Sequence, residues 1–330
     1  MLSALRHECL SAPPGDHEVS PLPARRPAIL DGGGQDDLEK PRPIVKWAGG
    51  KRRLLSQYEA HFPVEYNNYF EPFVGGAAVF FHLCPTGAPG GGGCNRSPLE
   101  GCNRGSRQSY LTDVNGELIN LYKQVQKKPA PLLIALERHQ AMHSKEHYYH
   151  VRSQSPSQLN PVERAARLIY LNRTCFNGLY RVNSSGGFNV PIGRYKNPTI
   201  LQPERLMRAH QTLQGVKLAV EPYLKAVTRA QAGDFVYFDP PYWPLSVSSS
   251  FTSYAQGNFG ESDQRSLAQI FASLAERGVK VALSNSKTPL IEELYRNFPQ
   301  ITVHAARCIN SRGDQRNAIE ELLILSQPVL

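Results

Sequence analysis

Residues 233–242 constrain the fold most, because a short apolar run there stops abruptly at an acid, two prolines and a tyrosine. Phe235–Phe238 has the composition of a strand buried on both faces. Pro240 has no N–H to donate to a sheet, so the strand must end before it. In an open α/β sheet, ligands bind at the carboxyl edge of such strands. We therefore expect Asp239, Pro240 and Tyr242 to line a site.

The groups at this strand end suit the recognition of an amine. The Asp239 carboxylate and the Pro240 carbonyl can accept the two hydrogens of one amino group. The Tyr242 ring offers a face on which a planar base can stack. On these residues alone a structural interpretation stays open, in which the strand ends in a proline turn and the acid binds neighbouring backbone.

Positive charge is concentrated in one part of the chain. Residues 151–230 carry 12 Lys and Arg against 3 Asp and Glu, a net charge of +9 that equals the net charge of the whole chain. Such a segment predicts a polyanionic partner, although a solvated basic surface without a partner would have the same composition.

The composition indicates a globular protein, with 41% hydrophobic residues. No apolar run approaches the ~18 residues of a membrane span, and the N-terminus lacks the apolar core of a signal peptide. The six cysteines are scattered without a C-x-x-C pair. We therefore expect a cytoplasmic protein with reduced thiols and no membrane partner.

A glycine turn upstream predicts a nucleotide-type cofactor site. Residues 68–81 have the pattern of a strand, a tight turn at Gly75 and a helix, and Asp113 ends the next expected strand. The gap between Gly75 and Asp113 is about twice the usual ~20 residues. Residues 87–107 are rich in Gly and Pro and contain Gly-Cys-Asn-Arg twice. We interpret them as an inserted surface loop, which costs little to close.

Two patterns suggest a metal site only weakly. Cys84, Cys94 and Cys102 lack the paired spacing of zinc ligands. Residues 143–147 match the H-x-x-E-H pattern of one metallopeptidase group, but no third ligand is evident. A histidine-rich helical surface is the better interpretation, and we predict no metal.

Residues 172–195 have the composition of a DNA-reading segment. Arg, Asn, aromatic residues and Gly alternate there, and Ser-Ser-Gly-Gly is the expected tip of a hairpin. Arg pairs with guanine edges or phosphates, and Asn pairs with adenine. A structural β-ribbon with polar edges is the alternative. The candidate DNA-binding residues are Arg173, Asn177, Arg181, Asn183 and Arg194.

Five motifs occur in one order along residues 43–326: Lys-Trp-Ala-Gly-Gly-Lys at 46–51, Glu-Pro-Phe-Val-Gly-Gly at 71–76, Asp113, the block at 173–194, and Asp-Pro-Pro-Tyr at 239–242. In these motifs the chain resembles the Dam-like DNA adenine methyltransferases. The resemblance implies that S-adenosylmethionine is the methyl donor and that the acceptor is N6 of an adenine flipped out of double-stranded DNA, often in GATC. It implies no metal.

The resemblance also implies roles for single residues. Trp47, Lys51, Phe73 and Gly75 would lie against S-adenosylmethionine, and Asp113 would bind its ribose hydroxyls. Tyr242 would stack on the flipped adenine, while Asp239 and Pro240 hold N6. One departure is Gly76-Ala77, where many relatives have Ala-Gly.

The implied fold class is α/β, a Rossmann-like methyltransferase sheet with helices on both faces and an inserted, smaller, mainly helical DNA-recognition domain with a β-hairpin. The expected division is a disordered leader at 1–40, a catalytic domain at 41–120 and 231–330 with a flexible loop at about 85–107, and the recognition domain at 121–230. We expect a monomer. Whether a restriction endonuclease is its partner stays open.

Three other functions remain as alternatives. Relatives that methylate cytosine N4, RNA or protein generally carry Ser or Asn where Asp239 stands. A nicotinamide dehydrogenase would share the sheet but lack the Asp-Pro-Pro-Tyr corner and the basic segment. A non-catalytic DNA-binding protein would keep the basic segment and lose the cofactor site.

Overall fold

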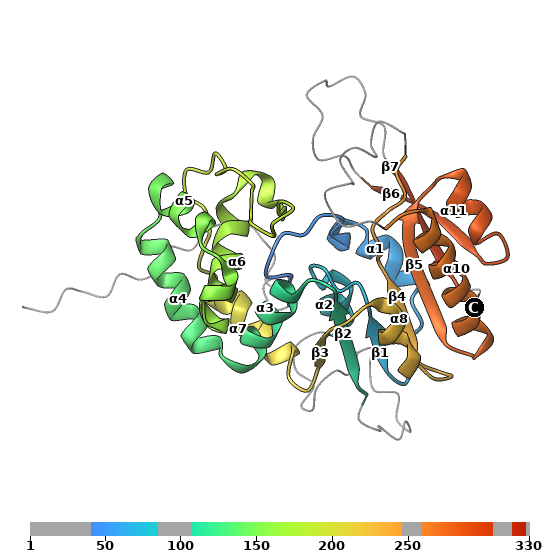
Figure 1. The fold of residues 1–330 in the computed structure, drawn as a ribbon. Helices are drawn as coiled ribbons and strands as arrows, with labels where there is room; N and C mark the ends of the chain where they lie inside the picture. Colours follow the sequence, from blue (N-terminus) through green and yellow to red (C-terminus); the bar gives the residue numbers. More distant parts are fainter. Residues whose placement is uncertain (1–40, 85–106, 246–258, 306–318, 328–330) are drawn as a thin grey trace, which may run out of the picture. The chain divides into compact units, whose positions relative to one another are not determined.

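A computed structural model describes residues 41–84, 107–245, 259–305 and 319–327, so the predicted leader and the glycine-rich insert lie outside the described residues. The described residues form a seven-stranded sheet in the order β3-β2-β1-β4-β5-β7-β6 (Figure 1). Neighbours from β3 to β5 pair in parallel, whereas β7 is antiparallel to both β5 and β6. The strands are β1 (Tyr69–Glu71), β2 (Ser109–Asp113), β3 (Lys217–Val220), β4 (Phe235–Phe238), β5 (Lys280–Ser286), β6 (Gln300–Ala305) and β7 (Ile319–Leu325).

Helices connect these strands. The described α-helices are α1 (Leu55–Tyr58), α2 (Ala78–Leu83), α3 (Gly116–Lys127), α4 (Pro129–Ala141), α5 (Lys145–Ser153), α6 (Pro161–Thr174), α7 (Pro203–Thr212), α8 (Tyr223–Ala226), α10 (Glu261–Glu276) and α11 (Pro289–Leu294). Short 3₁₀ turns are η2 (Lys51–Arg53), η3 (Glu59–His61), η4 (Pro156–Gln158), η5 (Phe176–Gly178) and η6 (Val227–Arg229). None of the described helices is long and apolar enough to cross a membrane.

The core lies on both faces of the sheet, as predicted for an α/β fold. All four residues of β4 are buried, and alternate side chains point to opposite faces. Phe235 and Tyr237 belong to one apolar cluster, which includes side chains of α2, α3 and α6. Val236 and Phe238 belong to a second cluster, which includes side chains of α10 and α11. The prediction of a strand buried on both faces is therefore confirmed.

Helix α6 begins where its sequence predicts. The Asn160 side chain accepts hydrogen bonds from the N–H groups of Val162 and Glu163, and Pro161 occupies the first turn. Such a cap satisfies N–H groups that have no partner within the helix. Helix α6 packs against α3, α4 and α5 and leads directly into the segment at 172–195.

Strand β3 lies inside the segment 121–230, which the sequence assigned to DNA recognition. It pairs in parallel with β2, with Val220 opposite Asp113. Its residues are exposed or half-buried, as expected at a sheet edge. A four-residue edge strand has no long apolar run, so the sequence gives no clear signal for it. The part of that segment from residue 217 onward therefore joins the sheet.

Candidate active site

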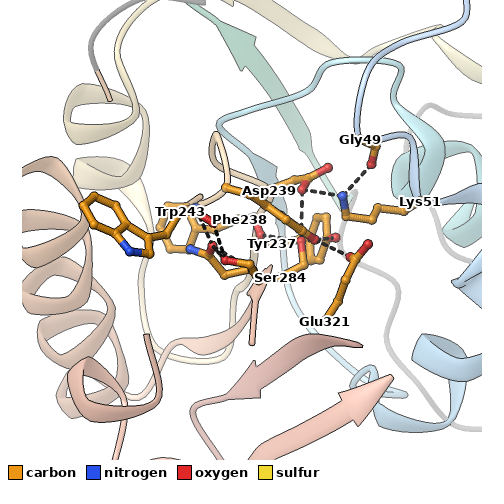
Figure 2. A network of polar contacts seen from close by, with 11 residues as sticks. Gly49, Lys51, Tyr237, Phe238, Asp239, Trp243, Ser284 and Glu321 are labelled. Atoms are coloured by element: carbon orange, nitrogen blue, oxygen red, sulfur yellow. Dashed lines mark hydrogen bonds and ion pairs between the residues drawn. The ribbon is translucent and has the colours of Figure 1, made fainter. Parts of the chain in front are cut away.

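Asp239 follows the last residue of β4 and has one carboxylate oxygen occupied. Its Oδ1 accepts a hydrogen bond from Ser284 Oγ at 3.0 Å and pairs with Lys51 Nζ at 2.8 Å (Figure 2). No described residue donates to Oδ2, and the side chain is 22% exposed. Desolvation raises the pKa of Asp239 above its ordinary value, although Lys51 and Ser284 oppose the rise. The contacts on Oδ1 leave Oδ2 available to a ligand.

Of the backbone carbonyls that follow Asp239, some accept a hydrogen bond from within the protein and others do not. Gln264 Nε2 donates to the Pro241 carbonyl at 2.9 Å, and Ser286 Oγ donates to the Trp243 carbonyl at 2.5 Å. Among the described residues, none donates to the carbonyl of Pro240. The Pro240 carbonyl is therefore a second open acceptor at this corner. Two open acceptors beside each other are what an amino group needs.

Tyr242 is held at its hydroxyl and lies against a cation. Its hydroxyl donates to Glu321 Oε2 at 2.7 Å. The Lys51 ammonium lies 4.4 Å from the centroid of its ring. Burial, with the negative charges nearby, raises the pKa of Tyr242 well above its ordinary value, so the hydroxyl remains a donor.

Lys51 lies at the corner after β4. The side chain is buried, and its ammonium contacts Asp239, the face of Tyr242 and the Gly49 carbonyl. Gly49 has a φ of +75°, which favours glycine because it has no Cβ. The sequence analysis predicted Lys51 against the cofactor, whereas its charged end lies on the carboxylate at the end of β4.

The glycine turn after β1 meets the end of β2, despite their separation in sequence. The Gly75 N–H donates to Asp113 Oδ2 at 3.1 Å, and the Tyr122 hydroxyl donates to the Gly75 carbonyl at 2.7 Å. Gly75 has a φ of +45°, and a Cβ there would lie 2.8 Å from Trp47 Cδ1. Desolvation raises the pKa of Asp113. The structure thus brings together Trp47, Gly75 and Asp113.

Phe73 links this turn to the corner after β4. Its ring stacks on Tyr223 at 5.2 Å between centroids and lies edge-on to Phe259 at 5.8 Å. It also lies 6.3 Å from the ring of Phe238, the residue before Asp239. The predicted cofactor residues and the predicted amine-binding residues are therefore parts of one region at the carboxyl edge of the sheet.

Three of the candidate DNA-binding residues make contacts within the protein: Arg173, Asn183 and Arg181. Arg173 donates from its guanidinium to the Ile44 carbonyl, and burial lowers its pKa to about 10. Asn183 Oδ1 accepts from the N–H groups of Ser185 at 3.1 Å and Gly187 at 2.7 Å. Asn183 therefore builds the tip of the predicted hairpin.

Four of the candidates are exposed: Asn177, Arg181, Asn183 and Arg194. Asn177 has a φ of +55° within η5, and Arg194 lies near the end of the segment. Arg181 Nε donates to Asn189 Oδ1 at 2.7 Å, across the hairpin. The hairpin is present as isolated antiparallel bridges, one of which joins Val182 to Phe188.

The histidines of α4 and α5 contact one another and a tyrosine. His139 Nδ1 lies 3.0 Å from His147 Nε2, and His143 Nδ1 lies 3.0 Å from the Tyr170 hydroxyl. Within the described ranges, no group of three or more His, Cys, Asp or Glu side chains could hold a metal ion. Cys84 is buried, and the other two cysteines of that pattern, Cys94 and Cys102, lie outside the described residues.

The sequence analysis did not identify Ser284 and Glu321 as parts of this site. Ser284 was visible as the first polar residue after the apolar run of β5. Glu321 lies on β7, whose only sequence signal is a pair of acids before an apolar run. Neither signal shows that β7 lies beside β5, so the contact with Tyr242 could not be predicted.

Comparison with known proteins agrees with this geometry. Residues 47–89 and 98–309 match the family model of the D12 class N6 adenine-specific DNA methyltransferases. A type II methyltransferase of Lactococcus lactis subsp. cremoris is 42% identical over 289 residues, which cover 86% of this chain and 94% of the relative. A DNA adenine methylase of Escherichia coli K12 is 34% identical over 293 residues, which cover 88% and 97%.

A second type II methyltransferase, from Methanocaldococcus jannaschii, is 38% identical over 305 residues and covers 86% of this chain and 99% of the relative. The family model covers strands β1 to β6 and the helices between β2 and β3. The chain therefore belongs to the D12 class N6 adenine-specific DNA methyltransferase family.

Proposed function

We propose that the chain transfers a methyl group from S-adenosylmethionine to N6 of an adenine flipped out of double-stranded DNA, with GATC as the expected target. The observation that carries the proposal is the pair of open acceptors, Asp239 Oδ2 and the Pro240 carbonyl, beside the bonded Asp239 Oδ1 and the bonded carbonyls of Pro241 and Trp243. Relatives named DNA adenine methylase support adenine as the base.

The residues around Gly75 fit S-adenosylmethionine. Gly75 has no side chain, and the Trp47 ring packs where a Cβ would lie, so Trp47 and the backbone of the turn are held close together. Asp113 has the carboxylate that ribose hydroxyls require, and Phe73 adds an aromatic face. When bound, S-adenosylmethionine supplies a methyl group already activated on a sulfonium. The protein therefore contributes chiefly by positioning the amine.

The corner after β4 would position that amine. Asp239 Oδ2 and the Pro240 carbonyl would accept the two N6 hydrogens and so direct the nitrogen lone pair away from both oxygens. Flipping an adenine out of the duplex costs a few kcal/mol. Stacking on Tyr242 would return about 1–3 kcal/mol of this cost.

The segment at 172–195 would face the DNA. We propose that exposed Asn177, Arg181 and Arg194 contact bases or phosphates, whereas Arg173 and Asn183 hold the segment in shape through their internal contacts. The recognition unit would then lie within 121–230 before β3, as an insert in a monomeric catalytic sheet. Some relatives are type II methyltransferases and others DNA adenine methylases. A restriction endonuclease partner therefore stays open.

Methyl transfer from tritiated S-adenosylmethionine to duplex DNA tests the proposal. The wild type should label GATC-containing DNA, and Asp239→Ala should lose at least about 100-fold of the rate because the amine is no longer positioned. The variant should still bind DNA, because phosphate contacts come from elsewhere. Arg181→Ala is the comparison variant. It should bind DNA more weakly than the wild type, and its DNA affinity should depend less on salt concentration. Equal rates for Asp239→Ala and wild type would refute the assignment.

A further inference from the structure

Strand β7 carries two adjacent acids that make different contacts. Glu320 is exposed and pairs with Lys287 Nζ at 3.1 Å, with about half of its side chain in solvent. Glu321 is half-buried, and its Oε2 accepts the Tyr242 hydroxyl at 2.7 Å (Figure 2). Adjacent strand residues point to opposite faces. The same strand therefore provides a site-facing acid and a matched control beside it.

The hydrogen bond from Tyr242 to Glu321 restricts the ring. The backbone before the ring is held because Gln264 donates to the Pro241 carbonyl, and the backbone after it is held because the Trp243 N–H donates to Asn285 Oδ1 at 3.1 Å. The hydroxyl at the far end is held by Glu321. With both ends of the side chain fixed, the long axis of the ring cannot swing away, and the Lys51 ammonium lies against the ring face. A hydrogen bond to an ionised acceptor is among the stronger kinds.

A fixed ring matters for base flipping. An extruded adenine must find a stacking surface at once, and ordering a mobile ring at that moment would reduce the stacking free energy. Among the described residues, the hydrogen bond to Glu321 Oε2 is the contact that fixes the Tyr242 hydroxyl. Glu321 is brought there by the antiparallel pairing of β7 with β5, in which it lies opposite Ser286.

We propose that Glu321 is a positioning residue for the methyl transfer, acting through Tyr242 by holding the ring as a preformed stacking face for the target base. The proposal rests on the proposed function, because it assumes that a flipped adenine stacks on Tyr242. Glu321 itself need not touch the base or the methyl donor.

The test compares Glu321→Ala, Glu321→Gln and Glu320→Ala in the full-length chain. Steady-state methylation gives kcat and KM for duplex DNA, and 2-aminopurine at the target position reports extrusion by its fluorescence. Glu321→Ala should lower kcat/KM about tenfold, which is the loss of one charge-assisted hydrogen bond, and should reduce the fluorescence rise. Glu321→Gln keeps an acceptor oxygen and should recover most of both. Glu320→Ala should match the wild type.

The outcomes separate this inference from the proposed function. A wild type that leaves duplex DNA unmethylated overturns both. An active wild type with Glu321→Ala equal to Glu320→Ala overturns the positioning role alone, as does a Glu321→Gln variant no better than Glu321→Ala. If Glu321→Ala does not fold, Tyr242→Phe removes the same hydrogen bond while keeping the ring. Tyr242→Phe should show the same tenfold loss of kcat/KM. Unchanged kinetics of Tyr242→Phe would also overturn the positioning role of Glu321.

Discussion

The ion pair between Lys51 and Asp239 gives a stability prediction that a double-mutant cycle can measure. The two charged atoms lie 2.8 Å apart, with side chains 3% and 22% exposed. At an effective dielectric constant of 20, the gross attraction at this distance is about 6 kcal/mol. Desolvation of both groups cancels most of it. We expect a net coupling of about 2 kcal/mol, because Asp239 retains some solvent.

The perturbations are Lys51→Met, Asp239→Asn and the two together. Asp239→Asn leaves a buried ammonium without its counter-charge, so it should cost about 2–3 kcal/mol of unfolding free energy. Lys51→Met should cost less, because Asp239 can take up a proton once the ammonium is gone. The double variant should lose about 2 kcal/mol less than the sum of the single losses.

Urea denaturation at pH 7 measures all four free energies of unfolding. Additive losses, with a coupling below about 0.5 kcal/mol, would show that the pair does not interact and would refute the reasoning. The same Lys51→Met variant should raise the pKa of Asp239 further, because the ammonium opposes the rise that desolvation causes. If the corner works as proposed, the acidic limb of its pH–rate profile should move to higher pH.

Two further predictions concern His139 and Gly75. Burial lowers the pKa of His139 to about 4, below its unfolded value of ~6.5. Neutral His139 should therefore contribute its full share of the free energy of unfolding above about pH 6.5. Protonation in the unfolded state should make the free energy of unfolding about 1 kcal/mol lower at pH 5 than at pH 7. Denaturation at both pH values measures this loss, and a wild type and His139→Gln with equal pH dependence would contradict it. Gly75→Ala should weaken S-adenosylmethionine binding in calorimetry about tenfold, because its φ of +45° is strained for alanine and its Cβ meets Trp47. Gly76→Ala is the control, and equal affinities would refute the role of the turn.

Features that depend on neighbouring residues could be predicted from the sequence. The end of β4 follows from an apolar run and Pro240. The start of α6 follows from the cap at Asn160. The contact between Gly75 and Asp113 could be predicted once residues 87–107 were recognised as an insert, because parallel strands bring their carboxyl ends to one edge.

Features that depend on strand order could not be predicted in the same way. β3 is too short and too exposed to show a period. The resemblance placed Lys51 against the cofactor, and only the folded chain shows that its ammonium reaches Asp239. Glu321 reaches Tyr242 because β7 enters the sheet antiparallel between β5 and β6. Side-chain periodicity shows which face of a strand is buried and leaves its neighbours unspecified.

The position of β7 also has a consequence for how the protein is made. A ribosome releases β5 and β6 before β7, yet β7 must come to lie between them. Until it does, β5 has an unpaired edge and Tyr242 has no acceptor from Glu321. Biosynthesis therefore completes the corner last, after the basic segment has already emerged, so a growing chain exposes its positive charge before the contact between Tyr242 and Glu321 can form.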